Sequence, residues 1–309
     1  MNPLFSVLIP VFNREDYVGQ AIDSVLSQKC MDYELIVIDD GSTDRTPDVL
    51  QTYGSRIKML RQNNQGAEVA RNKAASVAKG EYLVYLDHDD LLLPFALATY
   101  KCIIAELGSP PLIIGNMVWF KGQFRSREEI NWPSVCEVFA FPDYLAKTVP
   151  VSISFSVMII RRALFDKMGG LTIGSSPLDD LDLMLRVGTT GPCVIIKTPV
   201  TVGYRSHAGN FHRDFPSMIR ALSFVAKAES RGEYPGGGNR RLDRHAYIGG
   251  MSWTWVRHAF KARRQVLAAK LLIKYRSMIV LGAFRKIYSK FFNPPRPHVI
   301  PIIIKQEEQ

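Results

Sequence analysis

The stretch Glu34-Leu35-Ile36-Val37-Ile38-Asp39-Asp40-Gly41-Ser42 decides the fold, because it joins an apolar strand to an acidic turn. A run of β-branched apolar residues without polar alternation is typical of a parallel strand that is covered on both faces. Similar runs recur on either side, separated by apolar residues at helical spacing. Such alternation predicts a mostly parallel sheet flanked by helices. The other predicted strands are 5–10, 58–61 and 81–86, and the helices are 17–27, one that opens at 46, and 67–78.

The second half of the chain is less regular. The expected elements are a strand at 153–160, helices at 162–167 and 177–187, a final strand at 193–196, and a helix at 218–229. A Pro-Gly linker at 235–238 precedes further helices rich in bases. With 309 residues, of which 47% are hydrophobic and 22% charged, the chain can bury a large core and does not have the composition of a disordered tail.

The net charge of +10 is unevenly placed. Residues 239–296 hold 14 Lys and Arg and one acid, Asp243, whereas the rest of the chain holds 25 bases and 28 acids. Bases interleaved with Trp, Phe, Leu and Ile are typical of helices that lie on an anionic membrane surface. The alternative is a helical cap that packs its apolar side on the enzyme and leaves its bases in water. Because no recognition motif accompanies the bases, we expect no nucleic acid partner.

No apolar run reaches the ~20 residues that cross a bilayer, and the N-terminus lacks the pattern of a signal peptide. We therefore expect a cytoplasmic protein, peripheral on the inner face of the membrane if the basic segment binds lipid.

The carboxyl ends of three predicted strands are expected to converge on one site, and two of them bring carboxylates. Pro10 and Val11 end the first strand, Asp39 and Asp40 end the second, and Asp87-His88-Asp89-Asp90 follows the fourth. Ligands of open parallel sheets bind beyond these ends. Acids this close repel each other unless a cation lies between them, which suits Mg or Mn bound to phosphates. Taken alone, each motif could be a turn or a solvated loop that caps a helix; together they predict one site.

These motifs resemble, in order, the signatures of family 2 glycosyltransferases with the GT-A fold. The resemblance covers roughly residues 4–215 and rests on 6–13, 34–46, 64–72 and 87–90. It implies an α/β GT-A domain at 1–215, with a Rossmann-like nucleotide-sugar-binding half at 1–108 and an acceptor half at 109–215. A basic helical segment at 216–309 follows.

The resemblance also implies a reaction. A sugar would pass with inversion from a nucleoside-diphosphate sugar (UDP-, dTDP- or GDP-linked) to a hydroxyl of a glycan or lipid-linked acceptor, in polysaccharide, cell-surface glycan or glycolipid synthesis. A divalent metal, Mn or Mg, would be the cofactor.

Roles for the donor side follow from the same resemblance. Asp40, with Asp39 beside it, corresponds to the acid that holds the nucleobase, and the backbone at Pro10 and Val11 borders the base. Arg71 corresponds to a residue that meets the pyrophosphate; the alternative is a surface arginine.

The metal site is implied in the same way. Asp87 and Asp89 correspond to the Asp-x-Asp signature, which binds the diphosphate through the metal, and Asp90 lies close by in a supporting place. His207, in an Arg-x-His element expected after the last strand, is a candidate metal ligand or diphosphate contact, or else a packing residue. His88 and His212 are weaker candidates for this role, and His88, like Asp87, is expected on the nucleotide-binding side.

The catalytic base is expected on the helix after Ser176, which resembles the family's Glu-Asp motif with Asp179 in place of Glu. With Ser176 as the cap, Asp179 comes third in the helix and can reach back to the cap. Asp182 can pair with Arg186 four residues later. Asp180 has no such partner in sequence and is the predicted base, and its place in the first turn favours the ionised form.

Two other functions fit parts of the sequence. A nucleotidyltransferase would carry a Gly-rich loop with a Lys after the first strand, but residues 10–14 contain no Gly. A non-catalytic binder of nucleotide sugars or membrane surfaces would retain Asp40 and tolerate the loss of Asp180.

Overall fold

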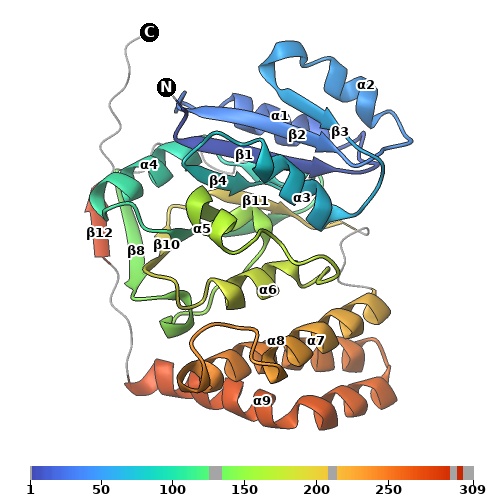
Figure 1. The fold of residues 1–309 in the computed structure, drawn as a ribbon, viewed down its shortest axis with the longest axis vertical. Coiled ribbons are helices and arrows are strands. Elements are labelled where there is room, and N and C mark those ends of the chain that lie inside the picture. The colour runs from blue at the N-terminus through green and yellow to red at the C-terminus, as the bar shows by residue number, and fades with distance from the viewer. Residues whose placement is uncertain (1, 125–133, 208–213, 293–297, 302–309) are drawn as a thin grey trace.

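The computed structural model is an α/β fold in which a large sheet carries helices on its faces (Figure 1). It describes residues 2–124, 134–207, 214–292 and 298–301, which contain a nine-stranded sheet of order β12-β8-β10-β6-β9-β4-β1-β2-β3 and a smaller sheet of order β5-β11-β7. The strands are β1 (Phe5–Val11), β2 (Tyr33–Asp39), β3 (Lys58–Arg61), β4 (Tyr82–Tyr85), β5 (Leu91–Leu92), β6 (Leu112–Ile114), β7 (Met117–Phe120), β8 (Val135–Phe141), β9 (Met158–Arg161), β10 (Cys193–Thr198), β11 (Val202–Arg205) and β12 (His298–Pro301).

The first four strands are parallel to one another, as the sequence predicted. Val7 on β1 lies opposite both Leu35 on β2 and Val84 on β4, and all seven residues of β1 are buried. Strand β9 then runs antiparallel between β4 and β6. The carboxyl ends of β1, β2 and β4 therefore meet at one edge of the sheet, where the predicted site residues stand.

The helices pack against the sheet and form a further layer below it. Figure 1 shows α7, α8 and α9 as this layer at the bottom of the molecule, under α6. On α1, the side chains of Val18, Ala21, Ile22 and Val25 are buried at helical spacing, as expected for a helix with one face on the core. The helices are α1 (Val18–Leu26), α2 (Thr46–Gln51), α3 (Ala67–Ser76), α4 (Ala96–Glu106), α5 (Arg162–Lys167), α6 (Asp179–Arg186), α7 (Phe215–Ser230), α8 (Arg241–Lys261) and α9 (Gln265–Phe292).

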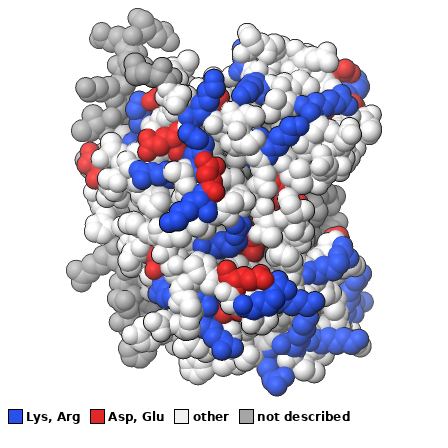
Figure 2. Space-filling view, in the orientation of Figure 1, with Lys and Arg blue, Asp and Glu red and all other residues white. Residues whose placement is uncertain are grey.

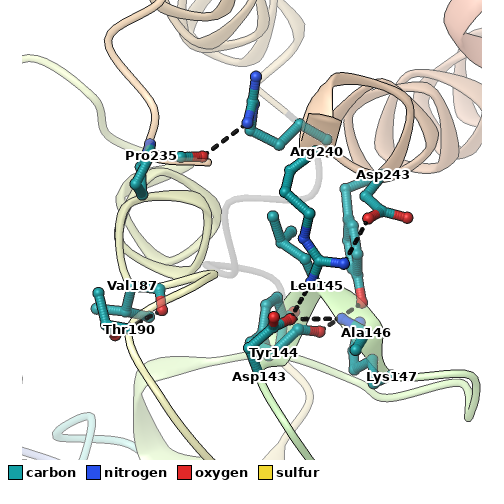
Figure 3. Close-up of polar contacts among 12 residues, drawn as sticks. Asp143, Tyr144, Leu145, Ala146, Lys147, Val187, Thr190, Pro235, Arg240 and Asp243 are labelled. Atoms are coloured by element: carbon teal, nitrogen blue, oxygen red, sulfur yellow. Dashed lines mark hydrogen bonds and ion pairs between the residues drawn. The ribbon is translucent and has the colours of Figure 1, made fainter. Parts of the chain in front are cut away.

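Polar contacts join the helical layer to the body of the protein. The Asp143 carboxylate accepts the backbone N–H of Ala146 at 2.7 Å and is ion-paired with Arg240, just before α8 (Figure 3). Arg240 also reaches Asp243 at 3.0 Å. The Tyr234 hydroxyl, between α7 and α8, donates to Asp182 on α6 at 2.7 Å. The layer is thereby tied to the helix that carries the predicted base.

Helices α8 and α9 approach each other closely at glycines. A Cβ on Gly249 of α8 would lie 1.8 Å from the carbonyl oxygen of Met278 on α9. A Cβ on Gly282 of α9 would lie 2.8 Å from the carbonyl oxygen of Ala246. Only residues without a side chain allow two helix backbones to come this near.

Several predicted elements need correction. The 193–196 strand is not the last one, because β11 and β12 follow it, and Tyr204 and Arg205 lie inside β11 rather than after the last strand. Segment 216–309 is not wholly helical, since β12 pairs antiparallel with β8. Helix α6 begins at Asp179 with Leu178 as its N-cap, so Ser176 is not the cap. The expected strand at 153–160 opens as a 3-10 turn, Phe155–Val157, where the Ser154 hydroxyl accepts a backbone N–H.

Candidate active site

Arg71 on α3 links two acids that are far apart in the sequence. Its Nη2 lies 2.7 Å from Asp87 Oδ1, and its Nη1 lies 2.8 Å from Asp179 Oδ2. The guanidinium is buried and sits over the Phe155 ring, 3.9 Å from the ring centroid, so Arg71 is not a surface arginine. The segment Asp87-His88-Asp89-Asp90 after β4, which we call the acidic tetrad, and the acidic start of α6 are therefore joined by the Arg71 guanidinium.

Two further residues on the same face of α3 hold the loop before α6, and the sequence analysis did not assign them. Glu68 Oε1 accepts the backbone N–H of Ser176 at 2.9 Å. Asn72 makes two bonds to Leu171, accepting its N–H at 2.7 Å and donating to its carbonyl at 2.9 Å. Positions 68, 71 and 72 follow the i, i+3, i+4 spacing of one helix face, which is the signal that could have identified them.

Asp179 and Asp180 begin α6 side by side but in different surroundings. Asp179 is buried and held by Arg71, and burial, opposed by Arg71, raises its pKa to about 6. Asp180 is partly exposed, and its Oδ1 accepts the backbone N–H of Leu181 at 2.6 Å. Burial, and then the charge of Asp179, raise the pKa of Asp180 to about 7. The expectation of a readily ionised Asp180 is therefore wrong, because desolvation outweighs the first-turn position.

Asp182 has a structural role, in line with the sequence analysis. Its carboxylate lies 3.9 Å from Arg186 and accepts the hydroxyls of Thr172 and Tyr234, each at 2.7 Å. Its side chain is buried and fully occupied by these contacts. Of the three acids in the first turn of α6, Asp180 is the one that neither an arginine nor a hydroxyl of the described residues holds.

Asp89 of the acidic tetrad is in contact with His207. His207 Nε2 lies 2.7 Å from Asp89 Oδ2, and the imidazole stacks on the Tyr17 ring at 5.2 Å with an interplanar angle of 19°. Arg205, two residues before His207, donates to the backbone carbonyl of Asp89 at 2.7 Å and lies over the Tyr17 ring. Burial would raise the pKa of Asp89, but His88 and His207 together hold it below its ordinary value.

The remaining tetrad residues bind the chain itself. Asp90 is buried and accepts the Ser156 hydroxyl at 2.6 Å and the Arg205 backbone N–H at 2.9 Å, so it fixes the loop as a supporting residue. His88 Nδ1 lies 3.1 Å from the carbonyl oxygen of Pro10. Burial holds the pKa of His88 below its ordinary value, and its Nε2 has no hydrogen-bond partner among the residues that the structure describes. His212 lies outside those residues.

The acids after β2 organise the neighbouring loops. Asp40 Oδ1 accepts the Gln62 side-chain amide at 2.7 Å and the Gln65 backbone N–H at 3.0 Å, and its Oδ2 accepts the Gly66 N–H at 2.9 Å. Asp39 Oδ1 accepts the Ser42 N–H at 2.9 Å. The turn requires Gly41, which has a φ of 81° and whose Cβ would lie 2.7 Å from the Asn64 nitrogen. In β1, the carbonyl of Val11 accepts the Asp40 N–H at 2.8 Å.

A divalent cation was expected at Asp87, Asp89 and His207. Within the described ranges, no group of three or more His, Cys, Asp or Glu side chains is arranged to hold a metal ion. The chemistry of the donors nevertheless fits, because carboxylate oxygens with one imidazole suit Mn. Asp89 and His207 already converge, and Asp87 has one oxygen that is not bonded to Arg71.

Known proteins resemble this chain in sequence and in fold. Residues 6–167 match the profile of the family described as Glycosyl transferase family 2. An uncharacterised glycosyltransferase of Rickettsia typhi is 37% identical over 195 residues, 60% of this chain and 58% of that protein. A PGL/p-HBAD biosynthesis glycosyltransferase of Mycobacterium bovis is 30% identical over 189 residues, 60% of this chain and 69% of that protein. The chain thus spans less than two thirds of the Rickettsia typhi relative.

Two solved structures have the same fold at low sequence identity. The S. aureus TarS 1-349 complex with UDP-GlcNAc has a TM-score of 0.62 and 16% identity, covering 94% of this chain and 87% of that one. The mannosyltransferase PcManGT from Pyrobaculum calidifontis, in complex with GDP-Man and Mn2+, has a TM-score of 0.56 and 20% identity, covering 94% and 88%. These likenesses confirm the fold expected from the sequence.

Proposed function

Because the chain belongs to glycosyl transferase family 2 and has a GT-A fold, we propose that it transfers a sugar from a nucleoside-diphosphate sugar to an acceptor hydroxyl with inversion. The observation that carries this proposal is the Arg71 bridge, which brings Asp87 of the tetrad and Asp179 of the α6 motif to one cation. The residues proposed for the donor side and for the acceptor side are thereby joined through Arg71.

The donor is proposed to lie beyond the carboxyl ends of β1, β2 and β4. Asp40, with Asp39, orders the loops around the nucleobase, and the ends of β1 at Pro10 and Val11 border it. His88, whose Nε2 has no partner among the described residues, is available to the nucleotide. The solved neighbours with UDP-GlcNAc and with GDP-Man support a nucleotide sugar as the donor class.

Asp180 is proposed as the general base. As the acceptor oxygen attacks the anomeric carbon, its proton passes to the Asp180 carboxylate, and the bond from that carbon to the diphosphate breaks on the opposite face. The electron pair leaves with the diphosphate, whose growing charge Arg71 offsets. A pKa of about 7 suits a base that works near neutral pH.

We propose Asp89, His207 and the Asp87 oxygen that does not contact Arg71 as the ligands of a divalent cation, Mn or Mg. When bound, such a cation supplies positive charge that stabilises the diphosphate. The support is the contact between Asp89 and His207 and the Mn2+ in the mannosyltransferase complex.

The proposed acceptor is a hydroxyl of a cell-surface glycan or of a lipid-linked glycan or glycolipid. The name of the mycobacterial relative, which refers to the biosynthesis of PGL and p-HBAD, supports this class.

A thermal-shift panel of UDP, GDP, dTDP and their sugars, with and without Mn, tests the donor. A ligand that binds only the native state raises the melting temperature, and we expect one nucleotide series to do so more strongly with Mn. NMR of the product anomer then tests inversion. The Asp180→Asn variant should keep the donor-induced shift and lose transfer.

The outcomes separate the alternatives. A wild-type protein that binds a nucleotide sugar but neither transfers nor hydrolyses it would be the non-catalytic binder. Absence of any shift with all three nucleotides, with or without Mn, would refute the donor assignment. The nucleotidyltransferase alternative has no support in the family match.

A further inference from the structure

The last long helix, α9, has one apolar face that is buried against the protein and a second one that is exposed among the described residues. Its inner face includes the buried side chains of Ala268, Leu271 and Tyr275. An outer stripe, which we define as Val266, Ile273, Val280, Phe284 and Ile287, is exposed, from 52% at Val280 to 71% at Val266. The spacings of seven, seven, four and three residues keep these side chains on one line along the helix. Over 28 residues, α9 is about 42 Å long.

Cations surround the outer stripe and acids are missing from it. Helix α9 contains no Asp or Glu, and Lys270, Lys274 and Arg276 are exposed beside the stripe. Figure 2 shows Lys and Arg side chains gathered over the lower right of the molecule, where the ends of α7, α8 and α9 lie. The exposed bases at the α8–α9 junction are Arg257, Lys261, Arg263 and Arg264.

The lone acid of the basic segment is already neutralised. Asp243 on α8 lies 3.0 Å from Arg240 and 3.2 Å from Arg285. Within the described part of residues 239–296, the outer stripe therefore faces solvent among bases, and the one carboxylate is already paired.

We propose that the outer stripe of α9 docks on an anionic lipid bilayer, with the stripe in the interface and the neighbouring bases on the headgroups. An exposed apolar line flanked by Lys and Arg is the pattern of a helix that lies in the membrane plane. No helix in the described part of the chain is long and apolar enough to span a bilayer. The inner face of α9 packs on the enzyme, as the helical-cap alternative required, so the same helix can serve both neighbours.

Charge favours lipid over the other occupants of such a face. A second copy of this chain would bring the bases of two α9 helices together with no acid from either helix, which is unfavourable. Nucleic acid would satisfy the bases but would leave the exposed Phe284 and Ile287 without apolar partners. An anionic bilayer offers both negative charge and an apolar interior to one surface.

Flotation of the full chain with vesicles tests the docking surface. We expect binding to mixed phosphatidylglycerol and phosphatidylcholine vesicles at about 0.1 M salt and much weaker binding to pure phosphatidylcholine. The Lys270→Gln/Arg276→Gln variant should bind the anionic vesicles about 30-fold more weakly, since each base near the surface contributes about a factor of five. That loss should shrink at high salt.

Two further variants make the test specific. Phe284→Ser should reduce binding to the anionic vesicles about 10-fold at any salt concentration, because it removes an apolar side chain rather than a charge. The matched control Lys29→Gln/Lys79→Gln removes two exposed bases from the nucleotide-binding half and should bind like the wild type. All variants should keep the wild-type melting temperature, since the side chains are exposed.

The proposal is overturned if the wild type does not float with anionic vesicles, or if the α9 variants bind as the wild type does. It is also overturned if sedimentation shows a dimer that Phe284→Ser converts to monomer, because the occupant would then be a second copy. Donor-induced thermal shifts are measured on the same samples, so a failure of lipid docking is distinguishable from a failure of the proposed transfer.

Discussion

Replacing Asp180 by Asn should make the protein more stable at alkaline pH while removing transfer. Burial and the charge of Asp179 raise the pKa of Asp180 from 3.8 to about 7 in the folded state. A shift of about three units corresponds to about 4 kcal/mol, and because the side chain is partly exposed, solvent reduces this to roughly 2 kcal/mol. Asn has no charge to desolvate, so the variant avoids this cost.

The sign of the pH dependence follows from the raised pKa. Between pH 4 and 7, the folded protein binds one more proton at Asp180 than the unfolded chain does, so the wild type loses stability as the pH rises through this window. Above about pH 7 both states are ionised and the difference is constant. The advantage of Asp180→Asn should therefore be about three times larger at pH 8 than at pH 5.

Urea unfolding at pH 5 and pH 8 measures this effect, with Asp16→Asn as the control for an exposed acid. Transfer by the wild type should rise with pH to a plateau above about 7, and Asp180→Asn should lose roughly 10²- to 10⁴-fold of the rate. An equal stability difference at both pH values would refute the reasoning about burial. If Asp180→Asn kept near-normal transfer and Asp179→Asn abolished it, the base would be Asp179.

Three more outcomes follow from the geometry. Gly249→Ala should destabilise the protein by about 1–3 kcal/mol in urea unfolding, because the added Cβ meets the backbone of Met278. The control Gly250→Ala, whose added Cβ has no atom within 4 Å, should be neutral or slightly stabilising. Similar losses of stability for both variants would contradict the close packing of α8 and α9. Arg71→Met should cost about 3–5 kcal/mol at pH 7 and less at pH 5, where the acids it leaves behind can protonate, and a loss independent of pH would argue against the shared ion pair. His207→Ala should raise the Mn concentration needed for half-maximal transfer on the order of 10-fold or more. Removal of the metal by a chelator should abolish transfer. An unchanged Mn dependence of the variant would show that His207 is not a metal ligand.

The sequence predicted the first half of the fold better than the second. Strands β1, β2 and β4 are largely apolar and largely buried, so the hydrophobic pattern identifies them. Strand β3 is a short edge strand that begins and ends with exposed bases, so its pattern is weaker. Strand β11 was not predicted, because it is short, contains Gly203 and pairs in the smaller sheet. Strand β12 was not predicted either, because it is an edge strand that follows a Pro-rich stretch and ends at a proline.

The candidate site was predictable as a set of residues but not as a set of contacts. Motif order identified Asp87, Asp89 and the acids of α6, yet nothing local in the sequence indicates that Arg71 reaches Asp179, 108 positions further along the chain. The raised pKa of Asp180 likewise depends on burial by segments distant in the chain. The position of Asp180 in the first turn of the helix predicted a lowered pKa instead.

The pairing of β12 with β8 has a consequence for synthesis of the chain. Strand β12 comes after α9 in sequence, so the ribosome delivers all three helices of the lower layer before the edge of the large sheet can be completed. Until then β8 presents an open edge, a place where nascent chains are prone to join one another. The edge of β8 can therefore be paired only after the C-terminal residues of β12 have been synthesised, which makes its closure a late step.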